Sequence, residues 1–121
     1  MEKKIREVSF SEDFVDFLSH LNFKVANKYD YVIRIIETKY VISEKFVKHL
    51  ENTDFYEMRV SLSSNEYRTV LFTVDADSFI ESKKVLLLNS FLKKDSRQYR
   101  AEIRKAENLL DQLRNKYAED K

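Results

Sequence analysis

Three consecutive β-strand patterns lie in the middle of the chain, and they restrict its possible folds more than any other feature. Residues 55–62 (FYEMRVSL) show the alternation of apolar and polar side chains that is typical of a β-strand. The even-numbered, largely apolar side chains then lie on one face, and Glu57 and Arg59 lie on the other. Residues 67–74 (YRTVLFTV) are rich in β-branched and aromatic side chains. Residues 84–91 (KVLLLNSF) are apolar nearly throughout, as expected for a central strand covered on both faces.

Helical periodicity flanks these strands on both sides. Ser11 is the expected cap of a first helix, and a second amphipathic helix is predicted from about Asn22. Before them, residues 4–10 alternate weakly and predict an edge strand; after them, residues 43–50 are interpreted as one or two helical turns. The last helix is predicted over residues 96–118, with a stripe made of Tyr99, Ile103, Ala106, Leu110, Leu113 and Tyr117.

This order of elements predicts an α+β fold of the form β-α-α-β-β-β-α. A small, twisted, mainly antiparallel sheet is expected to carry the two N-terminal helices on one face, with a separate C-terminal helix. With 121 residues, the chain is expected to form a single domain over residues 1–121.

The composition excludes several classes of functional site. The chain has no cysteine, which rules out disulfides and thiolate metal sites, and no glycine, which rules out Gly-rich phosphate-binding loops. Asp75 and Asp77 lack the remaining ligands of a calcium loop and are interpreted as turn formers, so no metal is expected. Without glycine, Asn65 is expected to adopt the left-handed turn conformation. No secretory signal or membrane span is recognised, and a cytoplasmic location is expected.

Positive charge is concentrated in one region although the net charge is only +1. Residues 83–105 include eight basic and two acidic residues, which gives this segment a local charge of +6. Such a cluster on a nearly neutral chain indicates a focused anion site. The alternative, a merely solvated helix face, stays open at this point.

The same region carries an ordered set of short motifs: Tyr56-Glu57-Met58-Arg59, then Tyr67-Arg68, then Asn89-Ser-Phe91-Leu-Lys93-Lys94, then Glu102-Ile103 with Ala106. In this order and spacing the motifs resemble the RelE/HigB superfamily of toxins, and most of all its phage-derived, HigB-like branch. The resemblance implies a RelE-like fold. Asn89-Ser90 depart from it, because many relatives have His-Gly there.

The resemblance also implies a function. It implies the toxin of a type II toxin–antitoxin system, a metal-independent endoribonuclease that cleaves mRNA on the ribosome and is held inactive by a cognate antitoxin, expected to be of the helix-turn-helix type. The implied reaction is attack of a 2′-hydroxyl on the neighbouring phosphate, which needs cations, a base and an acid but no cofactor. The alternative is a non-catalytic binding protein of the same fold, either related to ParE-like gyrase inhibitors or a degenerate phage protein.

Each motif contributes candidate site residues. Arg68 matches the Tyr-Arg arginine of the family and is the candidate cation for the phosphate, with Arg59 as a second contact. Lys93 and Lys94 match the basic pair, and because neighbours on an extended segment diverge, only one is expected to face the site. Glu57 is interpreted as a base or as an ion-pair partner of the arginines, and Tyr99 as an acid, a stacking platform or a core residue. Further RNA contacts are expected from Arg97, Arg100 and Arg104.

Overall fold

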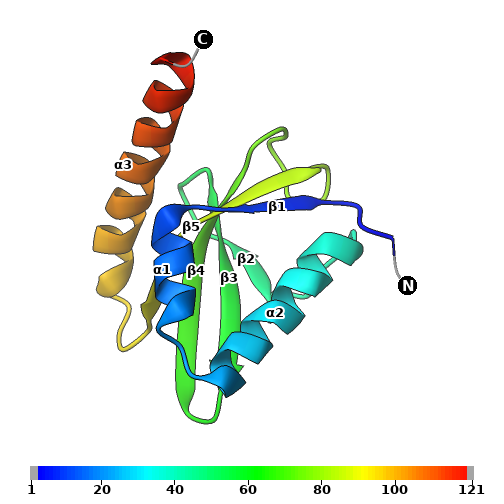
Figure 1. Cartoon of the computed structure of the whole chain (residues 1–121), viewed down its shortest axis with the longest axis vertical. Coiled ribbons are helices and arrows are strands. Elements are labelled where there is room, and N and C mark those ends of the chain that lie inside the picture. The colour runs from blue at the N-terminus through cyan, green and yellow to red at the C-terminus, as the bar shows by residue number, and fades with distance from the viewer. Residues whose placement is uncertain (1–2, 120–121) are drawn as a thin grey trace.

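The computed structural model describes residues 3–119 (Figure 1). The elements are β1 (Glu7–Phe10), α1 (Glu12–Ser19), α2 (Phe23–Thr38), β2 (Val47–His49), β3 (Phe55–Leu62), β4 (Asn65–Thr73), β5 (Lys84–Leu92) and α3 (Gln98–Glu119). The predicted α+β class and the order β-α-α-β-β-β-α are confirmed, with β2 as one additional strand. None of the helices in the described part of the chain has the length and apolar character needed to cross a membrane.

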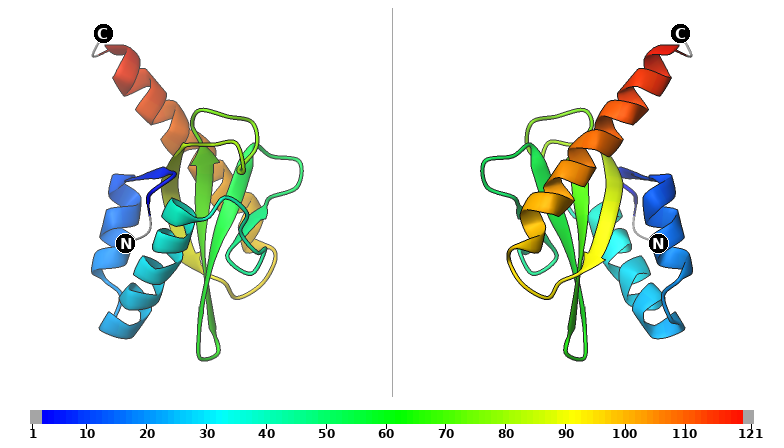
Figure 2. Two further views of the ribbon diagram at one scale, coloured as in Figure 1. Left: turned by 90° about the vertical axis from the view of Figure 1, so that its right-hand side faces the viewer. Right: turned by 90° about the vertical axis from the view of Figure 1, so that its left-hand side faces the viewer.

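The five strands form one sheet in the order β1-β5-β4-β3-β2. Only the pair of β1 and β5 is parallel, so the sheet is mainly antiparallel, as predicted. The N-terminal strand lies at one edge, also as predicted. Helices α1 and α2 cover one face of the sheet and α3 crosses the other, which Figure 2 shows from two sides.

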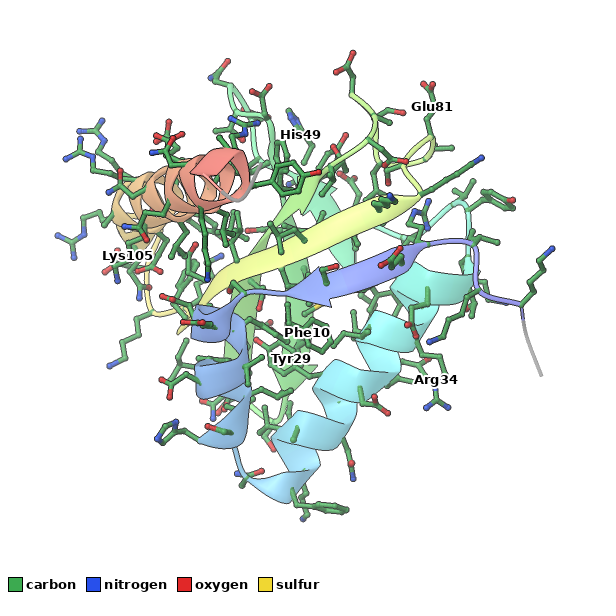
Figure 3. All side chains as sticks on the ribbon, turned by 45° about the horizontal axis from the view of Figure 1, so that its top comes forward. Phe10, Tyr29, Arg34, His49, Glu81 and Lys105 are labelled. Atoms are coloured by element: carbon green, nitrogen blue, oxygen red, sulfur yellow. The ribbon has the colours of Figure 1, made fainter. Side chains whose placement is uncertain are left out.

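The alternation of β3 decides which of its side chains meets which helix layer. Met58 and Val60 are buried in the cluster that contains Tyr29 of α2, and Tyr29 lies on the side of the sheet away from α3 (Figure 3). On the opposite face, a second cluster packs against Ala106 and Leu110 of α3. The polar residues of β3 therefore face α3, and this places the candidate residues Glu57 and Arg59 on that side.

The first N-terminal helix begins at its predicted cap, Ser11, and the second begins near the predicted residue, Asn22, which acts as its cap. The Ser11 hydroxyl accepts a hydrogen bond from the Phe14 amide at 3.0 Å and donates one to the carbonyl of Leu88 at 2.6 Å. The Asn22 side chain accepts from the amide of Val25 at 3.1 Å. Each cap satisfies an amide that the first turn of a helix leaves without a partner.

The prediction of helical turns over residues 43–50 is wrong, because this segment forms a turn and then the edge strand β2. Val47 pairs with Met58 and Lys48 with Glu57, and Val47 is buried. A segment this short cannot support a helix by itself. Pairing with β3 satisfies its backbone groups and buries Val47, so tertiary contacts outweigh the local helical pattern.

The prediction of a left-handed residue at Asn65 is also wrong. Asn65 begins β4, whereas positive φ occurs at Ser63 (58°) and Asn52 (62°) among the described residues. Leu62 pairs with Asn65, so the β3–β4 hairpin has a loop of two residues. Positive φ at only the first loop residue is the pattern of a type II′ turn, in which glycine is preferred at that position.

We therefore expect Ser63→Gly to raise the free energy of unfolding by about 0.5–1 kcal/mol, because glycine adopts positive φ without a steric penalty. Urea denaturation would measure the change. Ser64→Gly is the matched control, since Ser64 has no positive φ and its replacement should lower stability or leave it unchanged. A less stable Ser63→Gly protein would contradict this account of the turn.

The apolar stripe of the last helix is covered over only part of its length. Ala106 and Leu110 are buried, but Leu113 is 37% exposed and Tyr117 is 67% exposed. The reason is geometric: the C-terminal part of α3 extends past the edge of the sheet (Figure 2).

Candidate functional site

Two arginines and one glutamate form a compact group on the face of the sheet that α3 covers. Arg59 of β3 and Arg68 of β4 are directly opposite each other in the strand register. The Glu57 carboxylate lies close to both: Arg59 Nε donates to Glu57 Oε1 at 2.7 Å, and Arg68 Nε is 3.7 Å from the same oxygen. Like charges facing each other across strands repel, and the shared carboxylate offsets that repulsion.

Glu57 is almost completely buried, with 3% of its side chain exposed. Its Oε1 is held by Arg59, but its Oε2 accepts no hydrogen bond from any described residue. A buried carboxylate oxygen without a donor is unfavourable by about 1–3 kcal/mol or more. This buried oxygen therefore keeps a capacity to accept a hydrogen bond that no described residue uses.

Arg68 is held rigidly from several sides. Its Nη1 donates to the carbonyl of Tyr67 at 3.0 Å and lies 3.8 Å from Glu66 Oε2, and its Nε donates to the hydroxyl of Tyr99 at 3.3 Å. The side chain is 7% exposed. The ion pair with Glu57, which the sequence left open as an alternative role, is thus present in the structure, together with one to Glu66.

Tyr99 stands in the first turn of α3 and joins that helix to the group. Its ring packs edge-on against Phe91, with 5.6 Å between ring centroids, and the ammonium of Lys93 lies 5.7 Å from the centroid of the Tyr99 ring. Burial, reinforced by the nearby Glu57, raises the pKa of Tyr99, while Arg68 opposes the change. The hydroxyl is therefore neutral near pH 7 and can donate a proton but cannot act as a base.

An open pocket of about 330 Å³ lies in front of this group. Four of the candidate residues line it: Glu57, Arg59, Lys93 and Tyr99. Arg68, which is buried beside Glu57, is not among the lining residues. The other lining residues of the pocket are Lys48, His49, Leu50, Glu51 and Ile103. Segments far apart in the sequence, from β2, β3, the end of β5 and α3, thus form one site.

The remaining candidates lie outside this pocket. Lys94 is exposed and does not line the pocket, and its backbone amide donates to the side chain of Gln98 at 2.6 Å. Lys93 is therefore the member of the basic pair that reaches the pocket. Arg97 is exposed and pairs with Asp95 at 3.2 Å. Arg100 and Arg104 are exposed on α3 without lining the pocket. These residues therefore lie apart from the group around Glu57.

Sequence reasoning missed two residues at the pocket, Lys48 and His49. The histidine ring packs against Tyr56 with 5.1 Å between centroids, and its Nε2 is hydrogen-bonded to the carbonyl of Thr53 at 2.8 Å. Both residues belong to β2, and the interpretation of that segment as helix hid their position. The signal that could have found them was Val47, a β-branched residue suited to a strand.

Comparison with known families gives a clear match. A family model described as phage-derived Gp49-like proteins (DUF891) matches residues 16–111, which is most of the chain and includes every residue that lines the pocket. The chain belongs to this family. Among curated proteins, none matches this Gp49-like chain.

Solved structures add a fold comparison. The Gp49-like protein is similar to a mutant of the E. coli toxin RelE in its free state, with a TM-score of 0.58 and 18% sequence identity. The match covers 83% of this chain and 96% of that one. At this identity the likeness shows a shared fold. Together with the family match, it confirms the predicted membership of the RelE-like superfamily.

The departure at Asn89-Ser90 has a structural role in this Gp49-like protein. The β4–β5 register shifts between Thr69 and Leu71, so that Leu88 and Asn89 both stand opposite Val70. The Asn89 side-chain amide donates to the backbone carbonyl of Glu102 at 3.0 Å and to its Oε1 at 3.1 Å. Glu102 also pairs at 3.0 Å with Lys105, which lies on α3 and is labelled in Figure 3. The β-bulge thus anchors the N-terminal part of α3, which carries Tyr99.

Within residues 3–119, no group of three or more histidine or acidic side chains is placed to hold a metal ion. The ionisable groups that line the pocket are two ammonium groups, a guanidinium, two carboxylates, an imidazole and a phenol (Lys48, Lys93, Arg59, Glu51, Glu57, His49 and Tyr99).

Proposed function

We propose that this Gp49-like protein is the toxin of a toxin–antitoxin system and acts as a metal-independent endoribonuclease on mRNA, in a ribosome-dependent way. The observation that carries the proposal is the lining of one pocket, in which a carboxylate (Glu57) and a phenol (Tyr99) lie beside the cations Arg59 and Lys93. Cations, a proton acceptor and a proton donor are the groups that RNA cleavage by a 2′-hydroxyl requires.

The arginines supply the electrostatic part of the mechanism. A guanidinium binds phosphate oxygens bidentately, and Arg59 and Arg68 face each other on adjacent strands. Lys93 adds a third positive charge from the pocket wall. The negative charge on the phosphate oxygens grows in the transition state, so cations fixed in advance lower the barrier.

Glu57 and Tyr99 supply the proton transfers. Glu57 Oε2 accepts the proton of the attacking 2′-hydroxyl, and the neutral Tyr99 hydroxyl donates a proton to the leaving 5′-oxygen. The products are a 2′,3′-cyclic phosphate and a 5′-hydroxyl. Arg59 Nε donates to the other oxygen of the Glu57 carboxylate at 2.7 Å and so orients it.

The non-catalytic alternative is favoured by one feature of the same group. Glu57 and Glu66 already neutralise much of the charge of Arg59 and Arg68, so in the free protein an RNA phosphate has to compete with these carboxylates. A protein that only binds a partner through this fold could keep such pairs as structural elements.

Two partners follow from the proposal. Ribosome-bound mRNA is the substrate, and a small antitoxin, of the helix-turn-helix type, covers the basic pocket and protects the host. The place of action is the cytoplasm, where translated mRNA is found.

Controlled expression and in vitro cleavage test the proposal. We expect expression to arrest growth and the purified protein to cut a translated message in the presence of EDTA, leaving 2′,3′-cyclic phosphate ends. Coexpression of the antitoxin should relieve the arrest. A folded protein that cuts neither free nor ribosome-bound message would reject the endoribonuclease and leave the binding protein as the better account.

A further inference from the structure

The edge strand β2 brings a lysine to the pocket that the sequence motifs do not include. In the register of β2 and β3, Lys48 stands directly opposite Glu57. Opposed residues of an antiparallel pair project from the same face of the sheet, so Lys48 shares the face of Glu57, Arg59 and Arg68. It lines the same pocket as Arg59 and Lys93.

Lysine on an edge strand also has a purely protective use, because it discourages pairing with the edge strand of another molecule. Protection of the sheet edge does not require a pocket, whereas Lys48 lies at a pocket wall beside other cations. Lys45 provides the contrast. It is also exposed, but its ammonium lies 5.6 Å from the centroid of the Phe46 ring and it does not line the pocket.

The charges around the pocket differ in their availability to a ligand. Arg59 and Arg68 are engaged by Glu57 at 2.7 and 3.7 Å. Lys48 is exposed, and within residues 3–119 it takes part in none of the ion pairs. An RNA strand carries one negative charge per nucleotide, and those outside the reaction centre need cations at the rim.

We propose that Lys48 binds the RNA phosphate adjacent to the scissile one, and so contributes to RNA affinity but not to the chemical step. This rests on the proposed function of the same pocket. Arg59 and Arg68 lie deeper, beside the Glu57 carboxylate. Lys48 lies at the edge of the sheet, where it contacts the RNA backbone one nucleotide before or after the reacting one.

Salt-dependent RNA binding tests this contact. A short RNA with 2′-O-methyl groups cannot be cleaved, and its affinity can be followed by fluorescence anisotropy over a series of salt concentrations. Each phosphate contact on a single strand contributes about 0.7 to the slope of log affinity against log salt. We expect Lys48→Gln to reduce the magnitude of that slope by about 0.7 and to weaken binding about fivefold at moderate salt. Lys48→Arg should restore both quantities.

Lys45→Gln is the matched control, because it removes an equal charge three residues away. It should leave the slope within error of the wild-type value. In cleavage assays, Lys48→Gln should raise KM and leave kcat unchanged, as expected when a contact is equally strong in the ground state and the transition state.

The outcomes separate this inference from the proposed function. Wild-type protein that binds RNA without cutting it, with the slope lowered only by Lys48→Gln, would support the contact and reject the nuclease. If the wild type cuts RNA and Lys48→Gln keeps the wild-type slope and KM, the contact is rejected and the nuclease remains. If Lys48→Gln causes aggregation without changing the slope, the protective role of an edge lysine replaces the contact. A wild type that neither binds this RNA nor cuts ribosome-bound message rejects both.

Discussion

Arg68→Ala should lower the rate of mRNA cleavage by at least about a hundredfold, the effect found when one preorganised donor to a developing negative charge is removed. Arg68 has the largest expected effect because its guanidinium is fixed by Tyr67, Tyr99 and Glu57 before any substrate arrives. Arg68→Lys should recover only part of the activity, since a point charge does not reproduce the bidentate geometry of the guanidinium. Toeprinting of ribosome-bound message with each purified variant would measure both effects.

Stability has to be measured beside activity. Arg68 is buried, and its loss leaves Glu57 with Arg59 as its remaining cation, so some destabilisation of Arg68→Ala is expected. Circular dichroism and a thermal melt at the assay temperature establish how much protein is folded. Arg34→Ala is the control for removal of a positive charge, because Arg34 is 72% exposed on α2, on the side of the sheet opposite α3 (Figure 3). A folded Arg68→Ala protein that cleaves like the wild type would eliminate the proposed mechanism.

The fold could be predicted where local periodicity and burial agree. The alternation of residues 55–62, the cap at Ser11 and the start of the second helix near Asn22 are local signals, and the structure follows them. Residues 43–50 are different, because their helical pattern is weak and the edge of β3 decides their structure. The left-handed residue is Ser63 because the hairpin register places the loop there, and register depends on pairing across strands.

The candidate site, too, could be predicted only as far as local sequence signals determine it. Motifs identified Glu57, Arg68 and Tyr99, but their contacts depend on a strand register and on the bulge at Asn89 that anchors α3. The motifs also left Lys93 and Lys94 equivalent, and only the path of the chain after β5 distinguishes them. Residue types at a site can thus be read from a sequence, whereas the distances between them require the fold.

Arg6 illustrates a structural residue that no periodicity indicates. Residues 4–10 predicted an ordinary edge strand, yet the Arg6 side chain is 2% exposed. Its guanidinium donates to the carbonyls of Ile36 (3.0 Å), Lys39, Tyr40 (2.9 Å) and Phe79 (3.1 Å). Its charge also lies 4.1 Å from the centroid of the Phe79 ring. The last carbonyls of a helix lack backbone partners and carry partial negative charge, and Arg6 satisfies them at the end of α2.

Arg6→Met should therefore lower the free energy of unfolding by about 3–5 kcal/mol, because it leaves several carbonyls at the end of α2 without a donor. A thermal melt should show a decrease on the order of 10 °C in Tm. Arg6→Lys should recover only a fraction, since an ammonium cannot reproduce the fork of the guanidinium or reach all four carbonyls.

Lys4→Met is the matched control in the same segment. Lys4 pairs with Glu37 at 3.0 Å, but its side chain is 70% exposed. An ion pair of this kind contributes at most about 1 kcal/mol, so Tm should change little. If Arg6→Met and Lys4→Met shifted Tm equally, the carbonyls at the end of α2 would have to find other donors in the variant. The N-terminal segment would then be held to α2 by backbone hydrogen bonds rather than by the buried guanidinium. These bonds run from the Ile5 and Arg6 amides to the Glu37 carbonyl, at 2.7 and 3.2 Å.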